Sequence, residues 1–149
     1  WDLPPNLAVA STRVFAYTCP ANKQPKDEFG RWFTAYSMPT GANSVGANPN
    51  GTRLDEITDG LSSTVLAVEA CGSKIIWTDP RDVDIGIQPS GINVKGNRSG
   101  HSAGWISSYH PRQAVVLMAD GSVRSLAEST EPAVLKAMAT IDGHESIPE

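Results

Sequence analysis

The sequence predicts a single α+β domain over residues 1–149, built mainly from an antiparallel β-sheet with a short C-terminal helix. Three observations predict this fold. Residues 114–126 have the pattern of a β-hairpin, residues 64–68 are rich in β-branched side chains, and residues 131–141 carry apolar side chains at helical spacing. Apolar residues make up 40% of the chain and charged residues 19%, with 13 Gly and 11 Pro. This composition is typical of a turn-rich globular domain.

The first third of the chain predicts two strands and a loop. Residues 11–18 read as a short strand that ends at Cys19-Pro20. Residues 29–38 contain Trp32, Phe33 and Tyr36, and aromatic residues favour a partly buried strand. Residues 39–53 are dominated by Gly, Asn and Pro, which predicts a mobile surface loop.

The middle of the chain predicts two further strands. Residues 64–68 form one that ends at Glu69, and residues 74–77 form another that ends at Trp77. Glu69 needs a partner if it is buried, and Arg81 and Arg124 are the candidates. Residues 86–104 show no clear period and read as a second long loop.

The last third predicts the hairpin and the helix. Residues 114–119 read as a strand buried on both faces, and Asp120-Gly121 favours a two-residue type I′ turn before a second strand over residues 122–126. Thr130 can cap a helix that begins at Glu131, with Pro132 in its first turn. Asp142-Gly143 should end that helix.

Four ordered motifs and a Cys-Pro pair carry a resemblance to a known family. His110 is followed by nine residues and then Asp120-Gly121. The chain also has Asp59-Gly60 followed by Glu69, a W-T-x-P-x-D segment over residues 77–82 with Trp77 and Pro80, a T-x-x-G-x-E segment over residues 140–145, and the Cys19-Pro20 pair. Together they resemble the bacterial H-x(9)-D-G family, which is prepilin-type-processing-associated and is also a domain of unknown function.

The resemblance implies a non-catalytic envelope protein with a pilin-like or pseudopilin-like fold. The chain would be the globular head of a subunit associated with type II secretion or type IV pilus-type assembly. It would be the C-terminal soluble part of a longer protein, held in the inner membrane by an N-terminal helix absent here, and would lie in the periplasm or outside the cell. Expected partners are further copies or other secretion proteins, contacted through residues 39–53 and 86–109. In an exported protein, Cys19 and Cys71 would form a disulfide.

Charge and local spacing argue against several other classes. The net charge is −4 and the chain has no Lys/Arg cluster, so nucleic-acid binding lacks its electrostatic basis. Neither cysteine has a second Cys or a His at zinc-ligand spacing, which predicts no zinc site. Two acidic groups offer carboxylate ligands for calcium, although neither has the spacing of a calcium loop. The groups are Asp79, Asp82 and Asp84, and Asp55, Glu56 and Asp59.

His110 and Asp120 do not read as a catalytic pair. A strand rises about 3.3 Å per residue, so the strand that separates them spans roughly 20 Å. We therefore expect the motif residues to have structural roles. A hydrolase with His110 or His101 as its base is an alternative, but the chain has no G-x-S-x-G segment.

The tryptophans give another alternative. Trp32 and Trp77 lie in strand-like runs and are expected in the core. Trp105 lies in a loop-like stretch near Tyr109, and core packing is the better interpretation for it too. If Trp105 is exposed, then Trp105, Tyr109 and Trp32 are a possible platform for carbohydrate or another solute, or a partner surface.

Overall fold

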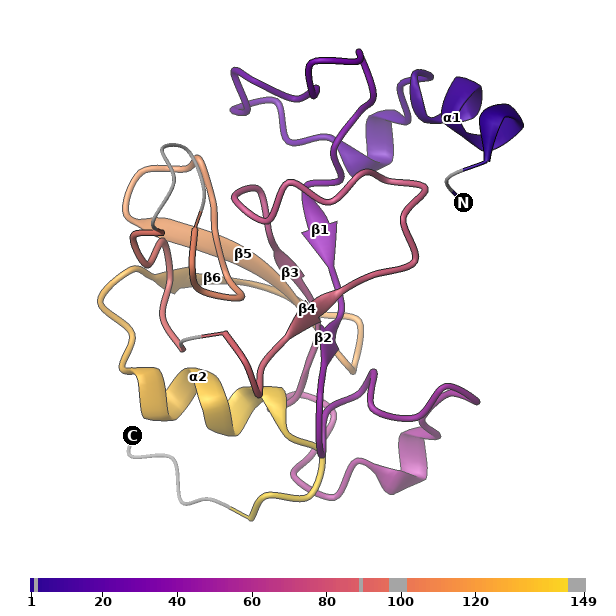
Figure 1. The fold of residues 1–149 in the computed structure, drawn as a ribbon. Helices are drawn as coiled ribbons and strands as arrows, with labels where there is room; N and C mark the ends of the chain where they lie inside the picture. The colour runs from indigo at the N-terminus through magenta and orange to yellow at the C-terminus, as the bar shows by residue number, and fades with distance from the viewer. Residues whose placement is uncertain (2, 89, 97–101, 145–149) are drawn as a thin grey trace.

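The fold has a four-stranded antiparallel sheet as its centre (Figure 1). The computed structural model describes residues 1, 3–88, 90–96 and 102–144. The strand order is β1-β3-β5-β6, and two further short strands, β2 and β4, pair in parallel. The strands are β1 (Tyr36–Ser37), β2 (Pro39–Thr40), β3 (Val65–Glu69), β4 (Val83–Asp84), β5 (Gln113–Met118) and β6 (Val123–Ala127). The helices are α1 (Pro4–Ala10) and α2 (Pro132–Ala139), with 3-10 turns η1 (Phe15–Tyr17) and η2 (Leu54–Glu56). The predicted α+β class, with its mainly antiparallel sheet and short C-terminal helix, is confirmed.

The β5–β6 hairpin is present as predicted, but its turn differs. The amide of Gly121 donates to the carbonyl of Met118 (3.0 Å), and the amide of Met118 donates to the carbonyl of Ser122 (2.8 Å). Gly121 has φ +85°, while Asp120 does not have positive φ. This pattern is a three-residue loop, a type I turn followed by a left-handed glycine, and not the expected type I′ turn. Only alternate residues of β5 are fully buried, so the strand is not buried on both faces.

Strand β3 carries a bulge that decides which side chains enter the core. Val65 pairs with Met118 and Val68 pairs with Val116, with a register shift between Val65 and Ala67. In a regular strand, residues three positions apart point to opposite faces. The extra residue of the bulge lets Val65 and Val68 point to the same face. Because side chains alternate along a strand, Glu69 then points to the other face.

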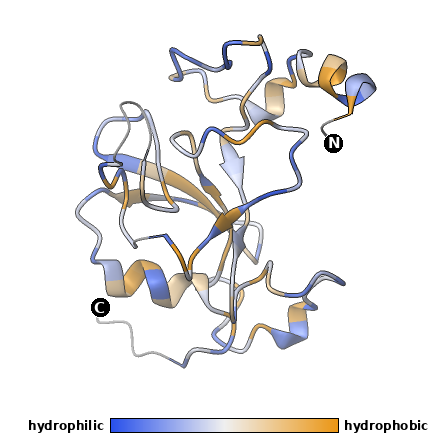
Figure 2. Cartoon of the chain, viewed as in Figure 1, coloured by the Kyte–Doolittle hydropathy of each residue, from blue (hydrophilic) through white to orange (hydrophobic). Residues whose placement is uncertain are grey.

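Helix α2 covers the face that carries Val65 and Val68. The helix lies beside the sheet and carries both hydrophobic and hydrophilic residues (Figures 1 and 2). Its buried Leu135, Met138 and Ala139 join the same hydrophobic cluster. The expected cap at Thr130 is wrong, because Glu131 is the N-cap and no side chain caps this end. The helix also ends before Asp142-Gly143. Thr140 leaves the helix in an extended conformation and bridges to Ser44.

Three apolar runs that predicted strands form other structures, wholly or in large part. Residues 11–18 contain the 3-10 turn η1, in which Phe15 is 75% exposed and has no sheet to join. In residues 29–38 only β1 is a strand, and Phe33 makes one isolated bridge to Ile76. That bridge is also the only β pairing within residues 74–77.

The predicted mobile loop over residues 39–53 is wrong for its first half. Pro39 and Ser44 are buried, the amide of Gly46 donates to the Pro39 carbonyl, and the amide of Ile141 donates to the Asn43 carbonyl. Residues 47–51 are exposed. Within the described residues, no helix has the length and apolar character needed to cross a membrane.

Candidate functional site

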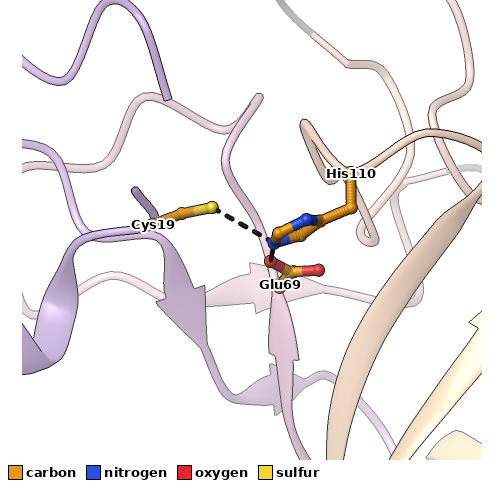
Figure 3. Close-up of side chains that lie close together, drawn as sticks. All are labelled: Cys19, Glu69 and His110. Atoms are coloured by element: carbon orange, nitrogen blue, oxygen red, sulfur yellow. Dashed lines mark hydrogen bonds and ion pairs between the residues drawn. The ribbon is translucent and has the colours of Figure 1, made fainter. Parts of the chain in front are cut away.

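Three side chains from distant parts of the sequence meet beside the end of β3: Cys19, Glu69 and His110 (Figure 3). The Nε2 atom of His110 lies 3.6 Å from Cys19 Sγ and 3.6 Å from Glu69 Oε1. The sulfur, carboxylate oxygen and ring nitrogen all lie within 4.8 Å of one another. Cys19 and Glu69 are buried, and the His110 side chain is 36% exposed.

Glu69 is fixed by the sheet. It is the last residue of β3 and is 1% exposed. Its Oε2 atom accepts a hydrogen bond of 2.7 Å from the backbone N–H of Val115 in the neighbouring strand. This bond orients the carboxylate and leaves Oε1 directed at His110. The sequence candidates for its partner were wrong, because Arg81 pairs with Asp79 and Arg124 lies on the exposed strand β6.

His110 is positioned by a chain of backbone contacts. The amide of Ser107 donates to the Glu69 carbonyl (2.8 Å), and Asn93 accepts a bond from the amide of Ser108 (2.8 Å). The Ser108 hydroxyl in turn accepts a bond from the amide of His110 (3.0 Å). The segment that carries the histidine is therefore held against the end of β3.

Cys19 lies beside the second cysteine. Cys71 continues the chain two residues after β3, and both cysteines are buried with Ala35. They lie 4.4 Å apart and are not bonded, so the disulfide expected from the family resemblance stays a prediction. Burial, together with the nearby charges of Cys19 and Glu69, raises the pKa of the Cys71 thiol to about 12. Cys71 is therefore a protonated thiol at neutral pH.

The cluster does not have the geometry of a hydrolase triad. In a triad, one ring nitrogen of the histidine faces the nucleophile and the other donates to the carboxylate. Here the same nitrogen, Nε2, faces both Cys19 and Glu69. Thiolate, imidazole and carboxylate are instead the three side-chain types that bind transition metals, and these three residues are the ones that could hold such an ion. His101, the other proposed base, lies outside the described residues.

The two ends of the H-x(9)-D-G segment make separate contacts. His110 belongs to the cluster, whereas Asp120 accepts a hydrogen bond from the amide of Ser122 in the hairpin turn (2.8 Å). The amide of Asp120 donates to the carbonyl of Leu61, so the turn is also tied to the Asp59-Gly60 segment.

Asp59 joins two motifs. Its Oδ2 atom accepts from the amide of Gly143 (2.7 Å) and its Oδ1 atom accepts from the amide of His144 (2.9 Å). Gly60, with φ +98°, adopts the left-handed conformation that glycine favours, and its carbonyl accepts from the amide of Thr64, the residue before β3. Glu145 of the same C-terminal motif lies outside the described residues.

The W-T-x-P-x-D segment also makes structural contacts. The indole N–H of Trp77 donates to the carbonyl of Thr12 (3.1 Å), and Pro80 is exposed. Asp82 Oδ1 accepts from the Ser37 hydroxyl (2.7 Å) and from the amide of Met38 (2.8 Å).

The acidic groups that suggested calcium have protein partners. Asp79 pairs with Arg81, and Asp84 accepts from the amide of Gly86. In the second group, Asp55 pairs with Arg53, Glu56 accepts from the amide of Arg53, and Asp59 binds the amides described above. Within the described residues, the cluster of Cys19, Glu69 and His110 is the only group of three metal-ligating side chains in mutual reach.

The tryptophan predictions are partly wrong. Trp105 is fully buried, as core packing predicts, so it cannot be part of an exposed platform. Trp32 and Trp77, expected in the core, are only half-buried. Tyr109 is 39% exposed, and its hydroxyl lies 3.2 Å from Lys74 Nζ.

Sequence reasoning missed the cluster because it tested cysteine spacing locally. The three residues are 50 and 41 positions apart and come from three separate motifs. The sequence did contain a signal for this cluster. Each of the three motifs contributes one residue of a metal-ligating type, namely Cys19, Glu69 and His110.

No family model, no curated protein and no solved structure matches this chain.

Proposed function

We propose that this chain is the globular head of a pilin-like or pseudopilin-like envelope protein, and that it acts by contact with other proteins and not by catalysis. The single observation that supports the proposal is that the motif residues make contacts between segments. Asp59 binds the amides of Gly143 and His144, and the amide of Asp120 binds the carbonyl of Leu61. These are the roles expected of residues that preserve one shape.

The head would face the periplasm or the outside of the cell, with an N-terminal helix beyond this chain as its inner-membrane anchor. Its contact surfaces would lie in the two long loop regions that the sequence singled out. Residues 47–51 are exposed in the first, and Ile87 is 81% exposed in the second. Burial of an apolar side chain this exposed against a partner lowers the free energy of the complex.

Fractionation and crosslinking test the proposal in the native bacterium. The protein is expressed from its own gene with a photo-crosslinking phenylalanine analogue at Asn48 or at Ile87. Val123, which is 66% exposed in β6, takes the same analogue as the control. We expect membrane or periplasmic fractions, and crosslinks from Asn48 or Ile87 to a second copy or to a secretion component, with none from Val123. A cytosolic protein, or crosslinks equal at all three positions, would overturn the proposal.

A solute-binding module is the second candidate, and a groove favours it. The groove has a volume of about 380 Å³, and Tyr17, Tyr36 and Trp77 line it beside Arg81 and Asp82. The Tyr17 and Trp77 rings lie 6.1 Å apart. Aromatic side chains beside charged groups suit a sugar ring. This platform replaces the one that included Trp105.

Glycan binding decides between the two candidates. If the groove binds sugars, the protein should retain members of an oligosaccharide array, and Tyr36→Ala should abolish retention while Tyr109→Ala does not. An array with no retained sugar would end this second candidate and leave the first unchanged.

A further inference from the structure

Two of the three ligand-atom separations in the cluster of Cys19, Glu69 and His110 match those of an open zinc site. Zinc binds sulfur at about 2.3 Å, nitrogen at about 2.0–2.1 Å and oxygen at about 2.0–2.2 Å. Tetrahedral angles then place neighbouring ligand atoms about 3.4–3.6 Å apart. The two separations that involve His110 Nε2 are both 3.6 Å, and the third lies within 4.8 Å. One nitrogen at this distance from both other ligands is what a shared metal requires.

The ligand types select the ion. Hard cations such as Ca²⁺ and Mg²⁺ take oxygen ligands, whereas a thiolate with an imidazole selects transition metals. The thiolate and the carboxylate carry two negative charges, which a divalent ion neutralises. A neutral site matters here because Cys19 and Glu69 are almost completely buried, and burial of uncompensated charge is costly.

The surrounding structure already orients the ligands. The backbone N–H of Val115 holds Glu69 Oε2, which leaves Oε1 for the metal. Such supporting hydrogen bonds around a metal ligand fix its orientation and strengthen metal binding. Cys19 begins a turn in which its carbonyl accepts from the amide of Asn22 (3.1 Å).

The neighbouring Cys71 is a poor fourth ligand. Its thiol lies 3.9 Å from the Ala35 carbonyl, and its sulfur does not belong to the group of ligand atoms that lie within 4.8 Å of one another. Three protein ligands with one open position, on the side where His110 is partly exposed, match zinc sites that keep a place for water or substrate.

We propose that the chain, with both cysteines reduced, binds one Zn²⁺ ion through Cys19 Sγ, Glu69 Oε1 and His110 Nε2. This goes beyond the proposed function, because a protein–protein contact role does not require a metal. Metal binding and a disulfide between Cys19 and Cys71 exclude each other, since both use the Cys19 sulfur. The redox state of the pair therefore controls occupancy.

Zinc titration of the purified protein tests the proposal, in a thiol-free phosphine reductant and with a chromophoric chelator as competitor. We expect one Zn²⁺ per chain. Cys19→Ser, Glu69→Gln and His110→Ala should each weaken binding by more than about 100-fold, because removal of a direct ligand exceeds the effect of losing a supporting group. With Co²⁺ in place of Zn²⁺, wild type should show thiolate-to-cobalt charge-transfer absorption that Cys19→Ser lacks.

Two variants serve as matched controls. His144 pairs with Asp59 at 3.6 Å, the same separation as His110 and Glu69, but among the residues that the structure describes it belongs to no group of three ligating side chains. His144→Ala and Cys71→Ser should both bind Zn²⁺ as wild type does. Far-ultraviolet circular dichroism in metal-free buffer shows which variants fold, and Cys19→Ser, a one-atom change, keeps the test decisive if Glu69→Gln does not fold.

The outcomes that overturn the proposal are distinct. Reduced wild type that binds no Zn²⁺ refutes it. Loss of binding in Cys71→Ser refutes the ligand assignment. A further test oxidises Cys19 and Cys71 to the disulfide with a diazene, which takes two electrons and two protons from the two thiols and becomes a hydrazine. Unchanged Zn²⁺ affinity after this oxidation would show that Cys19 is not a ligand. A protein–protein contact found by crosslinking would stand in each of these cases.

Discussion

Truncation of Glu69 should destabilise the fold through a lost hydrogen bond more than through a lost charge. The side chain is 1% exposed, and its Oε2 atom accepts from the Val115 amide at 2.7 Å. Glu69→Ala leaves that amide without its acceptor, which lowers the free energy of unfolding by about 1–3 kcal/mol. It also removes one buried methylene group, worth about 0.8 kcal/mol. Relief of the desolvated carboxylate acts in the opposite direction. We expect a net loss of about 2–3 kcal/mol.

Glu69→Gln is the matched variant. Its amide oxygen can still accept from Val115 and its methylene groups remain, so we expect a loss of at most about 1 kcal/mol. Urea unfolding in metal-free buffer, followed by circular dichroism, measures both values. If Glu69→Gln is destabilised as much as Glu69→Ala, the charge facing His110 matters and the hydrogen bond does not. If neither changes the free energy of unfolding, the reasoning about this buried carboxylate is wrong.

Three further predictions concern Cys71, Asp59 and Gly121. Burial and the neighbouring Cys19 and Glu69 raise the pKa of Cys71 to about 12, so at pH 9 it should carry on the order of 500-fold less thiolate than an ordinary cysteine. It should therefore react correspondingly slowly with iodoacetamide in the reduced wild type, as mass spectrometry of the Cys71 peptide measures, and fast alkylation at pH 9 would contradict this. Its contribution to stability should be full below pH 9 and be lost as pH rises toward 12. Asp59→Ala removes the acceptor of two amides, at Gly143 and its neighbour, and should lower the free energy of unfolding by about 1–2 kcal/mol, while Asp59→Asn should cost less. A Cβ on Gly121 would meet no atom within 4 Å, so Gly121→Ala should cost only the left-handed strain, about 1–2 kcal/mol in chemical denaturation, and a larger loss would refute the turn geometry.

The sequence predicted elements whose pattern is local. The Asp120-Gly121 hairpin, the β-branched strand β3 and the apolar stripe of α2 were all identified, because a few adjacent residues determine each of them. The boundaries were less accurate. Helix α2 ends at Ala139 because Thr140 pairs with Ser44, a contact between segments almost one hundred residues apart.

Apolar runs predicted strands at places where the chain offers no full partner strand. A strand forms only where another backbone satisfies its hydrogen bonds. Residues 11–18 have strand-like composition but join no sheet, and residues 74–77 make only a short pairing with residues 32–34. The candidate site was missed for a related reason. Cys19, Glu69 and His110 meet only after the chain has folded, and no spacing rule within one segment connects them.

The bulge in β3 has a consequence for how sequences of this fold can vary. It lies inside the strand, between the Gly60–Thr64 turn and Glu69, and it alone sets the alternation of the residues that follow. Relatives could therefore lengthen or shorten the preceding turn without rotating the carboxylate. A deletion at Leu66 would remove the extra residue and leave a regular strand, in which Val65 and Val68 still share a face and Glu69 still points to the other. A single insertion between Val68 and Glu69, in contrast, would turn the carboxylate toward the apolar layer beneath α2.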